Sequence, residues 1–121
     1  GENKGKLSIK QGDSVYMSDC IRMFALEKGL EQTTTLNRLK ALVELDIFEA
    51  GTAEHIKAAY EALNYLRLRN EIRLIEAGQP PNHFLDPTQL SRSEQELLKE
   101  AFHVVGKLQD ATKRHFSKSP K

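Results

Sequence analysis

Hydrophobic residues recur at helical spacing in four stretches of the chain, and polar residues, glycine or proline separate the stretches. The first stretch is residues 13–28, where i, i+3, i+4 and i+7 are occupied by Met17, Cys20, Ile21 and Phe24. Gly29 follows at the position of a glycine that ends a helix. A second, shorter helix is predicted over residues 35–45, because threonines 33–35 supply N-cap candidates and Leu36, Leu39 and Val43 form a stripe.

The other two predicted helices are longer. Residues 53–77 contain neither glycine nor proline, and Gly78 and Pro80 mark the end of this third helix. The fourth begins after Ser91, which forms a capping-box pattern with Glu94, and runs to about residue 116. The pattern therefore predicts an all-α fold, most simply an up-and-down four-helix bundle with a flexible N-terminal segment.

The two ends of the chain and the proline-rich connection contain few hydrophobic residues at regular spacing. Residues 1–12 hold three glycines, four charges and one short alternation over 7–10, which indicates a linker from an upstream domain or a strand whose partner lies elsewhere. Within the connection 78–90, Phe84 and Leu85 indicate a segment that is held against the bundle. The domain division predicted is a linker at 1–12, the bundle at 13–116 and a disordered tail at 117–121.

Composition narrows the class of protein. Of the 121 residues, 39% are hydrophobic and 29% charged, as in globular domains, and no apolar run approaches the ~20 residues of a membrane span. The chain has 18 basic and 17 acidic residues, so it has no strong net charge that would attract nucleic acid or an anionic membrane. Cys20 is the only cysteine, which excludes an internal disulfide and favours the cytoplasm.

Two polar residues interrupt the inward face of the third helix. At about 100° per residue, Arg67 and Asn70 fall within roughly 40° of the centre of that stripe. The apolar members of the stripe are Ile56, Ala59, Tyr60, Leu63 and Leu74. Either groups inside the bundle satisfy Arg67, or the stripe opens there into a polar pocket or an interface. Arg69 points the other way and is expected in solvent.

The first helix carries a second apolar strip, formed by Val15, Met23 and Leu26. A helix that is apolar on two sides is either central or covered by a further domain. Asp19 and Arg22 flank this strip at i, i+3, so they either pair with each other or help to dock another domain.

No catalytic pattern is present. Glu100 and His103 match the Glu-x-x-His spacing of metal-binding bundles, but those bundles use two copies and this chain has one. Nothing in the spacing of the other histidines, His55, His83 and His115, gathers them. We therefore expect neither a metal site nor catalysis within this chain.

Short motifs along residues 5–116 resemble, in order, the substrate-binding C-terminal domain of bacterial uridylyltransferase-like nucleotidyltransferases. The matching pieces are KGKLSIK (4–10), DCIRMFAL (19–26), TLNRL (35–39), LRLR (66–69), PNHFLDP (81–87), LSRSE (90–94) and LLKEAF (97–102). The resemblance implies that an upstream nucleotidyltransferase domain of the same chain binds Mg²⁺ and a nucleoside triphosphate, whereas this domain holds no cofactor. Proteins of this family often carry CBS pairs or a cyclic-nucleotide-binding domain as well.

Carried over position by position, the resemblance assigns substrate contacts to a set of charged residues. They are Lys10, Asp19, Arg22, Arg67 and Arg69, with Asn82 and Asp86 in the proline-rich loop. The family usually has a His and a Gln at the positions of Asn70 and Glu71. Asn70 stays among the candidate contacts because it shares the face of Arg67.

Two hypotheses follow. The first is a non-catalytic accessory domain that positions substrate and packs against the upstream nucleotidyltransferase domain. The second is an interaction module, a bundle that dimerises or couples CBS or cyclic-nucleotide-binding domains in signal transduction, with no ligand site. The second apolar strip of the first helix favours the latter, and Arg67 favours the former.

Overall fold

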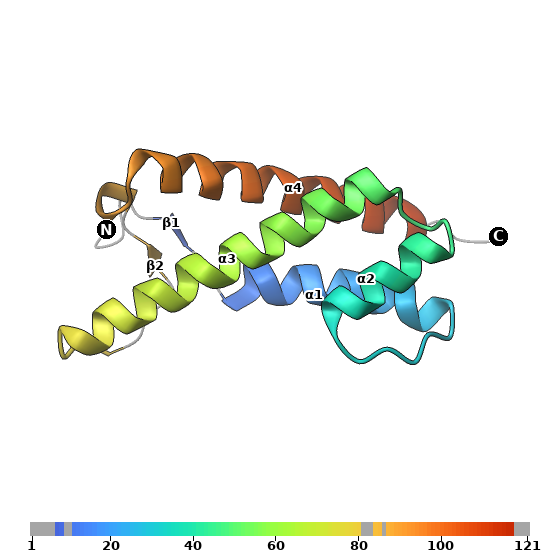
Figure 1. Ribbon diagram of the computed structural model, residues 1–121, viewed down its shortest axis with the longest axis horizontal. Helices are drawn as coiled ribbons and strands as arrows, with labels where there is room; N and C mark the ends of the chain where they lie inside the picture. The colour runs from blue at the N-terminus through green and yellow to red at the C-terminus, as the bar shows by residue number, and fades with distance from the viewer. Residues whose placement is uncertain (1–6, 9–10, 81–83, 86, 118–121) are drawn as a thin grey trace.

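The computed structural model describes residues 7–8, 11–80, 84–85 and 87–117 (Figure 1). Its elements, in chain order, are β1 (Leu7–Ser8), α1 (Gln11–Glu27), α2 (Thr35–Glu44), α3 (Ala50–Glu76), β2 (Phe84–Leu85), η1 (Pro87–Gln89) and α4 (Arg92–Phe116). The prediction of an all-α four-helix bundle is confirmed. The predicted linker 1–12 and tail 117–121 lie mostly outside the described residues.

The helix ends follow the local signals in the sequence. The Thr34 hydroxyl accepts a hydrogen bond from the backbone N–H of Asn37 at 3.2 Å, and the Ser91–Glu94 capping box is complete. Gly29 and Gly78 have φ of +68° and +70°, the left-handed conformation that a helix-ending glycine supplies. Capping chemistry thus sets where these helices begin and end.

The start of α3 differs from the prediction. The third helix was predicted over residues 53–77, but α3 begins at Ala50 and includes Gly51 and Thr52. The first N–H groups of a helix have no intrahelical partner, so residues of low helix propensity cost less there than in the middle. The turn between α2 and α3 is correspondingly short, and Asp46 lies in it with φ +60°.

The helices α2, α3 and α4 alternate in direction, whereas α1 and α2 point the same way. Arg69 near the end of α3 contacts Glu94 at the start of α4, so these two long helices are antiparallel (Figure 1). Ser18 in the first half of α1 bonds Thr35 at the start of α2, and Phe24 near the end of α1 contacts Phe48, which follows α2. Residues 28–34 therefore carry the chain back along the bundle before α2 begins, and the up-and-down alternation starts at α2.

The core lies where the four helices meet. Its largest fully buried side chains are Met17, Ile21, Leu42, Leu63, Leu66 and Leu98, and Cys20 is buried among them. On α3 the inward face includes Ala62 and Leu66, which the sequence stripe omitted, while Tyr60 and Leu74 are only half-buried. The face is therefore rotated slightly from the predicted one.

A short antiparallel strand pair links two distant segments. Leu7 pairs with Leu85 and Ser8 with Phe84. This pairing supplies the strand partner that the alternation at 7–10 required, and it ties Phe84 and Leu85 to the N-terminal segment. Within the described part of the chain, no helix combines the length and apolar character needed to cross a membrane.

Candidate functional site

A row of four polar side chains runs along α3, three residues apart: Asn64, Arg67, Asn70 and Arg73, hereafter the α3 polar row. Residues at i, i+3 are neighbours on a helix, so each member of the row lies beside the next, while the row as a whole winds around α3. Asn70 is buried and Arg67 half-buried, which confirms that both point inward despite their polarity.

Hydrogen bonds connect the row in pairs. Arg67 Nη2 donates to Asn64 Oδ1 at 3.4 Å, and Arg73 Nη2 donates to Asn70 Oδ1 at 3.1 Å. Arg73 also reaches η1, where its Nη1 donates to Gln89 Oε1 at 3.3 Å. The row thus lies beside the connection that joins α3 to α4.

Arg67 has a buried donor that its neighbours do not use. Among the described residues, its Nε is the one buried side-chain nitrogen or oxygen without a hydrogen-bond partner, and no carboxylate pairs with its guanidinium there. A buried N–H without a hydrogen bond costs about 1–3 kcal/mol of free energy, so native structures rarely leave such a group unpaired. A guanidinium with unused donors suits a phosphate or carboxylate, which accepts two parallel N–H bonds.

Arg69 is exposed, as its place on the outward side of α3 predicted, but it also makes a contact that the sequence did not reveal. It forms an ion pair with Glu94 across to α4. The Arg69 hydrogen bond holds the pKa of Glu94 at about 2, below its ordinary value of 4.5, and the backbone N–H of Ser91 acts in the same direction. A helical wheel misses this pair because it shows the face of Arg69 but not the neighbouring helix.

The remaining candidates are divided between α1 and the undescribed segments. Asp19 and Arg22 pair with each other at 3.6 Å, with both side chains more than half exposed, so the simpler of the two sequence interpretations holds for their contact. Lys10, Asn82 and Asp86 lie outside the residues whose side chains are described. Of the predicted contacts, the structure therefore brings together Arg67 and Asn70, and it adds Arg73 and Asn64, which sequence reasoning missed.

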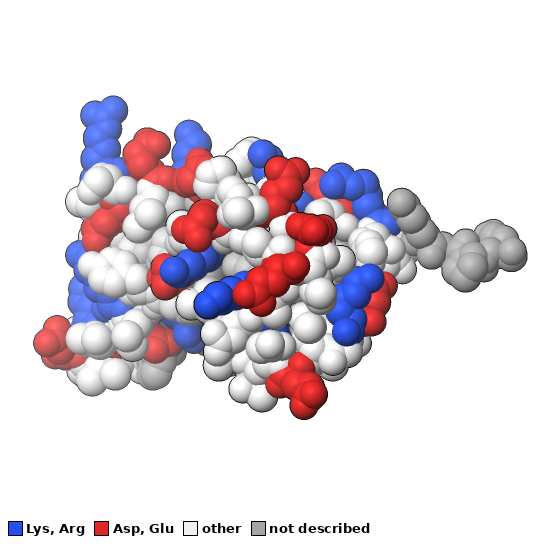
Figure 2. Space-filling view, turned by 45° about the vertical axis from the view of Figure 1, so that its right-hand side comes forward, with Lys and Arg blue, Asp and Glu red and all other residues white. Residues whose placement is uncertain are grey.

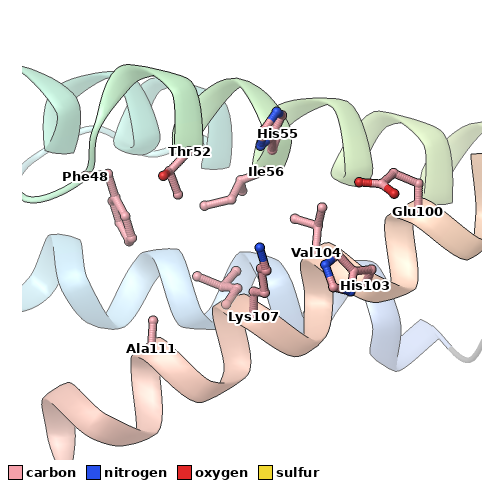
Figure 3. Close-up of a pocket in the computed structure, with 10 residues that line it drawn as sticks. Phe48, Thr52, His55, Ile56, Glu100, His103, Val104, Lys107 and Ala111 are labelled. Carbon is pink, nitrogen blue, oxygen red and sulfur yellow. The ribbon is translucent and has the colours of Figure 1, made fainter.

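A separate pocket of about 210 Å³ lies between the first half of α3 and the middle of α4 (Figure 3). Its polar lining comes from Thr52 and His55 on α3 and from Glu100, His103 and Lys107 on α4. Buried Ile56, Val104 and Leu108 form apolar walls. In Figure 3, Lys107 extends from α4 toward α3. The sequence did not gather His55 and His103, because only the antiparallel packing of α3 on α4 places them at one pocket.

The family comparison can now be set beside this geometry. A family model described as "putative nucleotidyltransferase substrate binding domain" matches residues 1–116. The chain belongs to this family. The resemblance found in the short motifs is thereby confirmed. A search of the curated proteins and a search of the solved structures found no match.

The family description of this nucleotidyltransferase substrate-binding domain names binding and no catalysis, in agreement with a chain that carries no catalytic pattern. Over the described residues, no three His, Cys, Asp or Glu side chains come together to hold a metal ion. Glu100 and His103 line the pocket together, but the site has only one such pair.

The surface of the substrate-binding domain carries both signs of charge. On the face shown in Figure 2, lysines and arginines lie among aspartates and glutamates. On α1, Val15, Met23 and Leu26 are exposed, so the second apolar strip of that helix is uncovered here. These surfaces differ in kind from the α3 polar row, where the polar groups are half-buried or buried.

Proposed function

We propose that this chain is the non-catalytic substrate-holding domain of a nucleotidyltransferase, and that it acts beside an upstream nucleotidyltransferase domain of the same protein. The family assignment supports the class. The observation that assigns the proposed role to particular residues is the buried Nε of Arg67, which has no hydrogen-bond partner among the described residues.

The ligand that fits this row is an anion. Arg67 and Arg73 are two positive charges of the same row, and their hydrogen-bond partners within it, Asn64 and Asn70, are neutral amides. A phosphate of the nucleotide or of the acceptor would supply the acceptors that the Arg67 guanidinium lacks. Mg²⁺ and the nucleoside triphosphate would be held mainly by the upstream domain, and this domain would orient the anionic part of the substrate.

The α1 strip is the surface proposed to pack against the upstream domain. Val15, Met23 and Leu26 are exposed apolar side chains, and the Asp19–Arg22 pair lies among them. An apolar centre with charged groups beside it is the usual composition of a domain interface. We place the protein in the cytoplasm, where nucleoside triphosphates are available and the thiol of Cys20 stays reduced.

Binding of pyrophosphate, followed by titration in a calorimeter or by NMR, tests the anion site directly. Wild-type chain should bind it, and Arg67→Met and Arg73→Met should each weaken binding by tenfold or more. Arg38→Met is the matched control, because Arg38 lies on α2 and donates to the carbonyl of Gln32. Unchanged binding in Arg67→Met, with unchanged melting temperature, would contradict the proposed site.

The second candidate function is an interaction module that couples CBS or cyclic-nucleotide-binding domains. The exposed α1 strip favours it, because such a module needs an apolar docking face and no ligand site. Substitutions in the full-length protein distinguish the two functions. The accessory-domain function predicts that Arg67→Met lowers transferase activity, whereas the interaction module predicts that only substitutions on the α1 strip have an effect.

A further inference from the structure

The second half of α3 carries a row of large apolar side chains that face solvent. Tyr65, Leu68, Ile72 and Ile75 are exposed by 55%, 56%, 48% and 66%. Single exposed apolar residues are ordinary on protein surfaces, but four on one helix face form a continuous patch. We call these four residues the α3 stripe.

The spacing of the α3 stripe is that of a helix-pairing seam. Its steps are three, four and three residues, which is the a/d pattern of a heptad repeat. The opposite side of α3 is already occupied, because Ala59, Leu63 and Leu66 pack in the core. A helix that buries one face in its own bundle and exposes a second apolar face to solvent can pack against one more helix through that second face.

The arrangement of the bundle leaves this seam open. In Figure 1, α3 and α4 lie close at the start of α3 and diverge toward its end, with β1 and β2 between them. Along the α3 stripe the surface has a shallow hollow, lined by Tyr65, Leu68, Ile72 and the flanking Arg69, Arg73 and Glu76. A hollow of this kind can receive an apolar side chain from a partner helix.

The charges on one flank of the stripe suit a second copy of the chain. With Tyr65 and Ile72 at a positions and Leu68 and Ile75 at d positions, Arg69 and Glu76 both occupy e positions on the same flank. In an antiparallel pair of identical helices the e positions face each other. A two-fold axis near Ile72 therefore sets Arg69 of each copy against Glu76 of the other, which gives two ion pairs from one contact.

We propose that two copies of this chain associate through the α3 stripe as an antiparallel, two-fold symmetric helix pair centred on Ile72. Arg69 keeps its bond to Glu94 while it faces the partner, because its guanidinium has five donors and its side chain is 43% exposed. The stripe is only about 15 Å long at 1.5 Å per residue, so the dimer is weak and forms with rising concentration. The dimer contact is separate from Arg67, which lies inward on α3, and it meets the anion site only at Arg73, which flanks the hollow.

Sedimentation of the chain over a micromolar to millimolar concentration series tests the dimer. Wild type should shift from monomer to dimer, and Ile72→Asp should stay monomeric at concentrations where wild type is mostly dimeric. Leu26→Asp is the matched control, since Leu26 is as exposed as Ile75 but lies on α1, and it should dimerise like wild type. Wild type that is monomeric throughout, or an Ile72→Asp variant that dimerises normally, would overturn the proposal.

Cysteine cross-linking tests the position of the axis. The native Cys20 is buried, so an introduced cysteine is the one accessible thiol among residues 11–80 and 87–117. Ile72→Cys should form a disulfide-linked dimer under mild oxidation, and Leu26→Cys should not. Glu76→Arg should weaken the wild-type dimer at least tenfold, because it sets Arg69 against a like charge. Equal cross-linking at positions 72 and 26 would rule out a centre at Ile72.

Discussion

Arg69 of α3 and Glu94 of α4 form an ion pair that joins the two longest helices where they begin to diverge. The same carboxylate accepts a hydrogen bond from the backbone N–H of Ser91 at 2.9 Å, as part of the capping box. Glu94 therefore serves both the start of α4 and its attachment to α3. A local helix signal and a tertiary contact share one side chain.

This double role predicts a loss of stability in acid. The folded pKa of Glu94 is about 2 and its ordinary value is 4.5. Because the folded pKa is the lower one, the stabilising contribution is complete above pH 4.5 and disappears as the pH falls toward 2. Urea unfolding across this range should show a steeper decline for wild type than for Glu94→Gln. Parallel curves for the two proteins would mean that Glu94 does not carry the effect.

Substitution of the two arginines should reverse the order of effects that the helical wheel suggests. Arg69→Met leaves Glu94 without its charge partner and should lower the melting temperature. Arg67→Met removes an unpaired buried N–H and keeps an apolar stem of similar length, so stability should be unchanged or slightly higher. Thermal melts of both variants provide the measurement. A larger loss in Arg67→Met than in Arg69→Met would point to a buried partner of Arg67.

The helices were predictable because their signals are local. Thr34, Ser91, Gly29 and Gly78 each act on backbone groups within a few residues, and all four mark helix ends in the structure. The start of α3 was missed because a glycine such as Gly51 costs less in the first turn of a helix than in its middle. The sense of α1 relative to α2 was missed because no local signal records the path of residues 28–34.

Core burial predicts a large difference between two leucines of similar chemistry. Leu63 is fully buried between the helices, whereas Leu26 is exposed on α1. Leu63→Ala should cost about 2–5 kcal/mol of unfolding free energy, and Leu26→Ala well under ~1 kcal/mol. Chemical denaturation of both variants measures the two values. Similar costs would mean that Leu26 is covered in solution, for example by association through α1.

The cap of α4 predicts a smaller, local effect. The Ser91 hydroxyl accepts from the backbone N–H of Glu94 at 3.2 Å, and Ser91→Ala removes that bond. The expected cost is about 1 kcal/mol, and Ser91→Asn should restore most of it because asparagine caps equally well. Denaturant midpoints of the three proteins measure this. If Ser91→Asn were as unstable as Ser91→Ala, the cap would not be the source of the loss.

The candidate site was predictable only where its members share a helix. Arg67 and Asn70 could be placed together by their spacing on one face. The partner of Arg69 lies 25 residues away on α4, and His55 and His103 meet at one pocket only through the packing of two helices. Residue spacing carries information along a single element, whereas contacts between elements depend on how the elements pack.

The burial of Cys20 gives the native chain a built-in reporter of its own opening. Cys20 is 2% exposed on the core face of α1, and it is the sole cysteine of the sequence. A thiol reagent can therefore react only after α1 separates from the bundle. When reclosing is faster than the reaction, the labelling rate is set by the fraction of molecules that are open at any moment. Time courses of labelling would thus measure the free energy of this opening without any denaturant.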